Sequence, residues 1–295
     1  MFKNFLRNYL VVVIINIFAS LLFVSNHYSV DVIAYPLDLV DIPGPYRFES
    51  VCLVNKNELW SVGGGGEIHF FNIETSKSMI YKLEDKSLFN GDFYGIYFNE
   101  NGNGWAVGDN GVIFHTANNG ANWKLQQSNV KENKDLQAIT CVNDNCWTVG
   151  EEGTVLVSDN KGEKWKIVDL KADENLKDVF FINEKIGWII GSEGGIWKTV
   201  DGGNNWSFQE LKIENEYAHS LSIKFQNEQK GWISGFDFVA RTEDGGKTWQ
   251  ITELDGKIIG IVTQDGEKIW AIRRGGNYCS KDAGKTWREC CVDMK

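Results

Sequence analysis

The chain has 295 residues, of which 42% are hydrophobic and 13% aromatic, so it can bury a sizeable core and is not globally disordered. Its 31 glycines and 3 prolines exclude collagen-like and proline-rich proteins. The net charge of −10 argues against a nucleic-acid-binding protein, because phosphate neutralisation requires clustered lysines and arginines.

Residues 1–30 are predicted to be an export signal. Lys3 and Arg7 precede an apolar run over 9–24, and the segment contains no acidic residue. This pattern is typical of a signal peptide, whereas the lack of a good cleavage site favours an uncleaved anchor in the inner membrane; both interpretations stay open. In either case the positive flank directs the rest of the chain outward, which predicts a periplasmic or other extracytoplasmic location. Residues 31–45 are expected to form a linker or an N-terminal strand.

A short tryptophan motif recurs through the rest of the chain. Four copies have the form Gly/Cys-Trp-x-x-Gly, and two looser copies flank them. The six tryptophans, which are 45, 42, 41, 44 and 38 residues apart, are Trp60, Trp105, Trp147, Trp188, Trp232 and Trp270. A period near 41 residues indicates an array of repeated structural units.

Each repeat contains four short runs of β-forming residues bounded by Gly, Asn and Asp. In the third repeat these runs are 136–142, 146–149, 154–157 and 164–168. Such runs indicate an antiparallel meander. We therefore predict an all-β β-propeller of four-stranded blades over residues 46–295. Six repeats give six blades, or seven if residues 31–46 build a partial blade. A two-sheet sandwich would not explain the period.

Five of the repeats carry a second motif, the Asp box, with the pattern Ser/Thr-x-Asp/Asn-x-Gly-x-x-Trp. The five copies are Thr116, Asn118, Gly120, Trp123; Ser158, Asn160, Gly162, Trp165; Thr199, Asp201, Gly203, Trp206; Thr242, Asp244, Gly246, Trp249; and Ser280, Asp282, Gly284, Trp287. The Asp or Asn side chain is expected to accept hydrogen bonds from turn N–H groups, Gly allows a positive φ, and Trp covers the turn. We therefore predict a structural role between the third and fourth strands of each blade, not a catalytic one.

Together, the Asp boxes and the Gly-Trp-x-x-Gly repeats resemble the Asp-box (BNR, sialidase-like) β-propeller superfamily, and within it most closely the photosystem II stability/assembly factor-like group. The resemblance covers residues 46–295. It implies the propeller fold and supplies assembly work as a precedent for function. Because members of such groups share a scaffold rather than one activity, it does not fix the function.

Enzymatic activity is not favoured. Sialidases hold the substrate carboxylate with an arginine triad, and the arginines of the predicted exported part are dispersed: Arg47, Arg241, Arg273, Arg274 and Arg288. Gly-x-Ser-x-Gly, His-Glu-x-x-His and P-loop motifs do not occur. Two carboxylates in a cleft would leave no motif, so a carbohydrate-active protein, either a lectin-like module or a sialidase-like glycosidase, is the alternative.

In a propeller the loops between the second and third strands converge on one face. The side chains expected there are Asp109, Glu151, Glu152, Glu193, Phe236, Asp237, Arg273 and Arg274. Five carboxylates would attract a basic peptide or a cation, and the arginine pair could hold a carboxylate. Phe236 is a candidate contact anchor. The alternative is that these are solvated loop charges.

All six cysteines lie in the predicted exported part. An even number in an oxidising compartment favours disulfides over metal ligation, and no Cys-x-x-Cys pair occurs, so neither a metal site nor a cofactor is predicted. Cys141 and Cys146 flank a turn between paired strands and are expected to form a cross-strand disulfide. The other candidates are Cys52, Cys279, Cys290 and Cys291, with one of the last two bonding Cys279 and the other Cys52; buried free thiols are the alternative.

The sequence therefore predicts an exported, non-catalytic platform for protein binding. Its expected partner is a segment of a membrane or envelope protein, held during assembly or stabilisation of a membrane or envelope complex. Nucleic acid is not an expected partner. The N-terminal segment would attach the chain to the membrane if it is not cleaved.

Overall fold

The computed structural model describes residues 48–55, 57–82, 89, 91–130, 134–213, 219–263, 266–273 and 276–290. The predicted export signal and the linker that follows it lie outside these residues. The regular structure of the described part consists of β-strands and short 3-10 turns. A helix of the length and apolarity that a membrane crossing requires does not occur in this part.

The chain is divided into two compact units, one over 44–210 and one that includes 211–295. The first unit contains four antiparallel sheets whose strands follow in chain order. The strands are β1 (Phe48–Asn55), β2 (Glu58–Gly63), β3 (Glu67–Asn72) and β4 (Lys77–Lys82); β5 (Phe93–Phe98), β6 (Gly104–Gly108), β7 (Ile113–Thr116) and β8 (Lys124–Gln126); β9 (Leu136–Val142), β10 (Asn145–Gly150), β11 (Thr154–Ser158) and β12 (Lys166–Asp169); β13 (Leu176–Phe181), β14 (Gly187–Gly191), β15 (Gly195–Thr199) and β16 (Ser207–Glu210). Each sheet is one sequence repeat.

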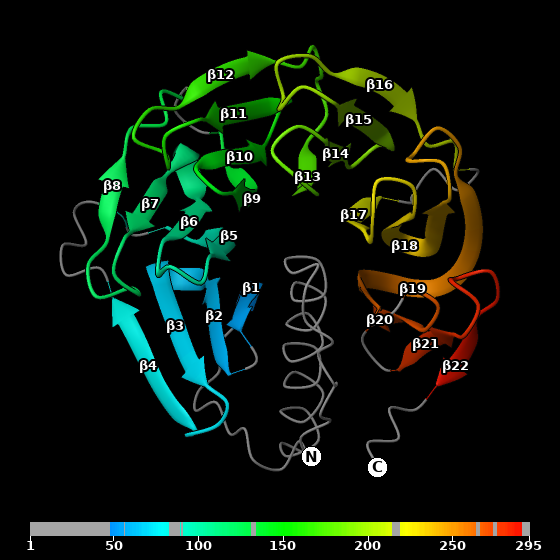
Figure 1. The fold of residues 1–295 in the computed structure, drawn as a ribbon, viewed down its shortest axis with the longest axis horizontal. Coiled ribbons are helices and arrows are strands. Elements are labelled where there is room, and N and C mark those ends of the chain that lie inside the picture. The colour runs from blue at the N-terminus through cyan, green and yellow to red at the C-terminus, as the bar shows by residue number, and fades with distance from the viewer. Residues whose placement is uncertain are drawn as a thin grey trace. The chain divides into compact units, whose positions relative to one another are not determined.

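Within this unit the four sheets lie side by side, with β1, β5, β9 and β13 innermost and β4, β8, β12 and β16 outermost (Figure 1). Burial follows this order. Every residue of β6 and β14 is buried, whereas β8, β12 and β16 are mostly exposed. β6 has a strand on each side and a neighbouring sheet over each face, which explains its continuous run of buried residues.

The unit that includes 211–295 contains the last two repeats. Its strands are β17 (Ser220–Phe225), β18 (Gly231–Thr242), β19 (Gln250–Thr263), β20 (Ile269–Arg273), β21 (Asn277–Ser280) and β22 (Arg288–Cys290). Residues 231–235 of β18 pair with β17, whereas 236–241 pair with the first half of β19, and the second half of β19 pairs with β20. β18 and β19 therefore each carry two strands of the repeat pattern. The four-stranded repeats confirm the all-β propeller class.

The buried core lies between adjacent sheets. The tryptophans of the first five repeats are at most 2% exposed, and each one reaches the next repeat's Asp box wherever both lie in the same unit. Trp105 Nε1 donates to the Lys161 carbonyl at 3.2 Å, Trp147 Nε1 to Gly202 at 2.9 Å, and Trp232 Nε1 to Ala283 at 3.3 Å. The two sequence motifs therefore recur together because one packs on the other.

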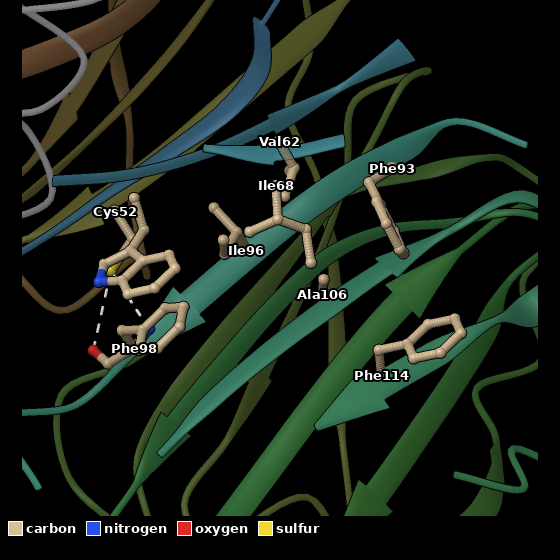
Figure 2. Packing of buried hydrophobic residues seen from close by; sticks show 9 residues of the cluster. Cys52, Val62, Ile68, Phe93, Ile96, Phe98, Ala106 and Phe114 are labelled. Carbon is tan, nitrogen blue, oxygen red and sulfur yellow. Dashed lines mark hydrogen bonds between the residues drawn. The ribbon is translucent and has the colours of Figure 1, made fainter. Parts of the chain in front are cut away.

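The cluster between the first two sheets illustrates this packing (Figure 2). Trp60 stacks on Phe98 with ring centroids 4.1 Å apart and planes inclined by 14°. The Cys52 sulfur accepts a hydrogen bond from the Phe98 N–H at 3.3 Å. The Phe98 ring covers Gly104, where a Cβ would come within 2.3 Å of it. Aromatic stacking over a glycine thus fixes the distance between the sheets.

The Asp boxes lie between the third and fourth strands, as predicted. In the second repeat the Thr116 hydroxyl donates to Asn118 Oδ1 at 3.0 Å and accepts the Gly120 N–H at 3.1 Å. The Asn118 side chain also accepts the Asn122 N–H at 3.0 Å. The same hydroxyl and side-chain bonds recur in the other four boxes. The side-chain oxygens of the Asp boxes therefore form hydrogen bonds within the turn, which supports a structural role for these residues.

The fifth repeat departs from the others in its core. Ser234 lies two residues after Trp232, where the second strands of the other repeats have Val or Ile. Its side chain is fully buried, and its hydroxyl has no hydrogen-bond partner among the described residues. A buried, unpaired hydroxyl destabilises the folded state. The site is therefore a weak point of the interface between the fifth and sixth repeats.

Candidate protein-binding face

The loops between the second and third strands lie at one end of the four sheets in the unit over 44–210. They comprise the 3-10 turns η2 (Gly64–Gly66) and η3 (Asp109–Gly111) and the turns over 151–153 and 192–194. The turns between first and second strands and the Asp boxes lie at the other end, because each sheet is an antiparallel meander. The predicted binding residues of this unit thus share one face, here called the loop face.

Each of the first three loops has a residue in the left-handed region at its second position, namely Gly65 (φ 74°), Asn110 (φ 56°) and Glu152 (φ 48°). A side chain that precedes the first strand of the next repeat accepts the N–H of that residue. The three bonds run from Gly65 to Asp92 Oδ1 at 2.8 Å, from Asn110 to Asp135 Oδ1 at 2.9 Å, and from Glu152 to Asn175 Oδ1 at 3.1 Å. Each loop tip is therefore attached to the following sheet.

Two of the carboxylates predicted for the loop face accept hydrogen bonds that hold these loops. Asp109 accepts the Asp92 N–H at 2.7 Å and the Tyr94 hydroxyl at 2.7 Å, and Glu151 accepts the Asp135 N–H at 3.2 Å. Burial, and then the hydrogen bond to Asp109, raises the pKa of Tyr94. Both carboxylates are half-buried. They therefore hold the loops in place, unlike the exposed ligand contacts that the sequence suggested.

The exposed carboxylates of the loop face are Glu152 and Glu193. The Glu152 carboxylate lies 2.8 Å from Lys134 Nζ. The Glu193 backbone N–H donates to Glu174 Oε2 at 2.6 Å, and burial raises the pKa of Glu174. The side chains of Glu152 and Glu193 thus extend from loops whose backbones are fixed.

Sequence reasoning missed the acceptors Asp92, Asp135 and Asn175. Each one stands immediately before the first buried residue of a first strand, as in Asp92-Phe93 and Asp135-Leu136. The Asp or Asn at the start of three successive repeats could have been recognised in the sequence. Its hydrogen-bond donor could not have been predicted, because that loop N–H belongs to the preceding repeat.

In the unit that includes 211–295, Phe236 is half-buried. Lys257 Nζ lies 5.2 Å from the centroid of its ring, and the His219 ring meets it edge-on at 6.0 Å. Asp237, with φ 62°, accepts the Gly256 N–H at 2.6 Å. Phe236 therefore packs against Lys257 and His219 and is only partly exposed, so it is less prominent than an anchor at a loop tip would be.

Arg273 is already paired within the chain. Its guanidinium forms an ion pair with Glu289, donates to the Asp255 carbonyl at 3.2 Å and lies 4.5 Å from the Tyr278 ring centroid. A bound carboxylate would have to displace Glu289. Arg274 lies outside the described residues. Arg241 likewise pairs with Glu243 at 2.8 Å.

The predicted Cys141–Cys146 disulfide is present in the structure, with both sulfurs buried. The expected bond from Cys279 to Cys290 or Cys291 is not formed, because Cys279 is a buried free thiol. The strand register places Cys279 opposite Arg288, and Cys290 opposite Asn277. Cys291 lies outside the described residues, and Cys52 packs on Phe98. Within the described residues no group of three or more His, Cys, Asp or Glu side chains is placed to hold a metal ion.

Solved structures with the same fold include two YCF48 proteins. One is described as YCF48 bound to D1 peptide, with 15% identity, a TM-score of 0.66 and coverage of 87% of each chain. The other is YCF48 from Cyanidioschyzon merolae, with 19% identity, a TM-score of 0.69 and coverage of 87% of this chain and 88% of that one. At these identities the likeness establishes the fold alone.

A GH74 enzyme from Niastella koreensis is also similar in fold, with 13% identity and a TM-score of 0.66. The match covers 81% of this chain but only 46% of the enzyme. No curated protein matches the sequence. The sequence pattern of the family described as "Photosynthesis system II assembly factor YCF48" matches residues 41–159 and again 157–294. These two matches span most of the chain, which therefore belongs to the YCF48 family of photosynthesis system II assembly factors.

Proposed function

We propose that this protein is a non-catalytic platform that binds a segment of a membrane or envelope protein while a complex containing that protein is assembled. Membership of an assembly-factor family supports the proposal. So does the solved structure of a YCF48 protein with a D1 peptide bound to it. The observation in this chain that carries it is the rigid loop face, with its outward carboxylates Glu152 and Glu193.

Rigidity matters because binding must offset the entropy of ordering flexible groups. The N–H bonds to Asp92, Asp135 and Asn175 fix three successive loop tips before any partner arrives. Of the two exposed carboxylates, Glu152 already lies beside Lys134 Nζ at 2.8 Å, so few side chains remain to be ordered. Such preorganisation suits a surface that recognises an extended segment.

Glu152 supports a binding role for a second reason. Its φ of 48° lies in the left-handed region, where a residue with a Cβ is about 1 kcal/mol less favourable than glycine. The first repeat has Gly65 at the equivalent position. The third repeat therefore presents an exposed carboxylate where the first repeat has no side chain.

Two finer features belong to the same proposal. We infer six blades, because the strand pairing provides four strands for each of six repeats. We also infer that the platform works outside the cytoplasm, a location that suits a chain with a buried disulfide. A fusion of alkaline phosphatase to the C-terminus, active only when exported, tests the location, and an inactive fusion contradicts it.

The binding proposal is tested by affinity purification from membranes of the native host, with the full chain as bait. The face variant is Glu152→Gln/Glu193→Gln. The matched control is Glu100→Gln/Glu163→Gln, because these two exposed glutamates lie at the opposite end of the same unit and the change in charge is equal.

We expect the wild type and the control to retain a membrane or envelope protein. The retained amount should be at least tenfold lower with the face variant. Equal retention by the face variant would reject the loop face as the binding site. If no protein is retained and the chain instead binds or cleaves glycans on an array, the carbohydrate-active alternative replaces the platform.

A further inference from the structure

Three repeats share an aromatic clamp at the end of the first strand. A phenylalanine there lies opposite the glycine that begins the second strand, in the pairs Phe98 with Gly104, Phe181 with Gly187, and Phe225 with Gly231. A Cβ on any of these glycines would come within 2.3 to 2.6 Å of the ring. The ring therefore lies flat over a position that only glycine can occupy.

In the unit over 44–210 the clamp supports the tryptophan of the preceding repeat. Trp60 stacks on Phe98 with centroids 4.1 Å apart, and Trp147 stacks on Phe181 at 3.6 Å. Each stack joins two sheets, so the clamp is part of the interface between repeats and not only of its own sheet.

The third repeat has no such phenylalanine. Cys141 and Cys146 are opposite each other in the same register, and a disulfide joins them. Their exposed fractions are 3% and 0%, and they belong to the buried cluster that contains Trp105 of the preceding repeat and Trp165. The sulfur pair thus occupies the place of the ring and glycine beside Trp105.

We propose that this disulfide is a redox-dependent clamp, so that the interface between the second and third repeats reaches full strength only where a disulfide-bearing oxidant has oxidised the two thiols. The clamp in the second, fourth and fifth repeats depends on a phenylalanine that is always present. In the third repeat it depends on a bond that the surroundings must supply. The chain therefore senses the redox state of the compartment in which it folds.

The oxidation proceeds by thiol–disulfide exchange. One cysteine thiolate attacks a disulfide of the oxidant, giving a mixed disulfide and releasing one oxidant thiol. The second cysteine thiolate then attacks the mixed disulfide, forming the Cys141–Cys146 bond and releasing the second oxidant thiol. Two electrons pass to the oxidant, and the two cysteine protons end on the released thiols.

Burial prevents the disulfide from forming or being reduced while the second and third sheets are packed together. Since Cys146 has no exposed surface and Cys141 almost none, exchange needs the second and third sheets to be apart. The thiols must therefore be oxidised before these sheets pack, and afterwards a reductant cannot reach the bond without unfolding the interface.

The size of the effect follows from the short loop. For a sequence separation of 5, loss of the cross-link lowers the folding equilibrium constant about 30-fold by the chain-entropy relation. The reduced sulfurs also separate to van der Waals distance in a packed site, which weakens the contact with Trp105 further.

The test uses the full chain, urea unfolding followed by tryptophan fluorescence, and dithiothreitol as the reductant. The variant Cys141→Phe/Cys146→Gly installs the pair found in the second, fourth and fifth repeats and leaves the other cysteines in place. A second variant, Cys141→Ala/Cys146→Ala, has neither clamp.

We expect reduction to lower the wild-type folding equilibrium constant about 30-fold and to leave that of the Phe/Gly variant unchanged. The Ala/Ala variant should be no more stable than the reduced wild type. Thiol trapping with mass measurement should show that dithiothreitol reduces the bond quickly in high urea and at least a hundredfold more slowly without urea.

Three results would each overturn the proposal. One is a reduced wild type as stable as the oxidised protein. Another is a Phe/Gly variant whose midpoint also falls with dithiothreitol, because other cysteines would then cause the effect. The third is reduction of the native protein as fast as that of the unfolded chain.

Discussion

The stack of Phe181 on Trp147 predicts that one aromatic ring accounts for much of the contact between the third and fourth sheets. The two ring centroids are 3.6 Å apart and the planes are inclined by 10°. Trp206 meets the Phe181 ring edge-on at 6.0 Å. We consider the substitution Phe181→Ala, which removes both contacts and leaves a cavity over Gly187. The matched control is Phe208→Ala in the outermost strand of the same sheet.

The expected magnitude follows from burial. Phe181 is 5% exposed and Phe208 is 63% exposed, so of about 200 Å² per ring roughly 190 Å² and 75 Å² are buried. At about 25 cal/mol per Å² these areas correspond to about 5 and 2 kcal/mol, and compact unfolded chains reduce both values. The cavity and the lost stack add to the first value only. We expect losses in unfolding free energy of about 4 kcal/mol for Phe181→Ala and about 1 kcal/mol for Phe208→Ala.

The assay is equilibrium urea unfolding by tryptophan fluorescence, with the slope compared between variants to confirm that the same transition is measured. Phe181→Ala should move the midpoint at least twice as far as Phe208→Ala. If the two variants shift the midpoint equally, or if the exposed ring matters more, the stack does not hold the sheets together and the reasoning fails.

Three further predictions concern single sites. Ser234→Val should raise the unfolding free energy by about 1 kcal/mol, because it removes a buried unpaired hydroxyl and adds apolar contact; a lower melting temperature in calorimetry would show that the site cannot accept the extra volume. Glu152→Gly should raise the unfolding free energy from urea titration by about 0.5–1 kcal/mol, because glycine adopts a positive φ without strain. The same variant should retain less of the partner. A less stable variant would show that Glu152 is not strained at this φ. Burial opposes ionisation of Asp244, but hydrogen bonds from Thr248 and Thr242 outweigh it and lower its pKa from 3.8 to about 2. Because the folded-state pKa is depressed, this carboxylate stabilises the fold fully above pH 4 and progressively less as the pH falls toward 2. Asp244→Asn should therefore flatten the acid-unfolding curve, followed by circular dichroism, between these pH values. An unchanged curve would show that other groups control acid unfolding.

The sequence alone determined the features that depend on short-range chemistry. The Asp boxes could be assigned because a hydroxyl, a carboxylate or amide and a glycine within five residues complete the turn by themselves, as Thr116, Asn118 and Gly120 do. The strands and their period could be assigned because alternating apolar runs and turn residues recur in every repeat. The Cys141–Cys146 bond was predictable for the same reason, since a four-residue turn places the two residues opposite each other.

Tertiary structure decided the roles of residues whose partners belong to other repeats or other strands. Asp109 and Glu151 had the appearance of exposed ligands in the sequence, yet they bond to N–H groups 17 and 16 residues earlier in the chain. Arg273 had the appearance of a free cation, yet Glu289 neutralises it across the strands of the last repeat. Such contacts depend on the angle and distance at which sheets and strands pack, and these are set by the aromatic and aliphatic side chains buried between the sheets. A local pattern cannot encode that geometry, because it results from the volumes of side chains that lie far apart in the sequence.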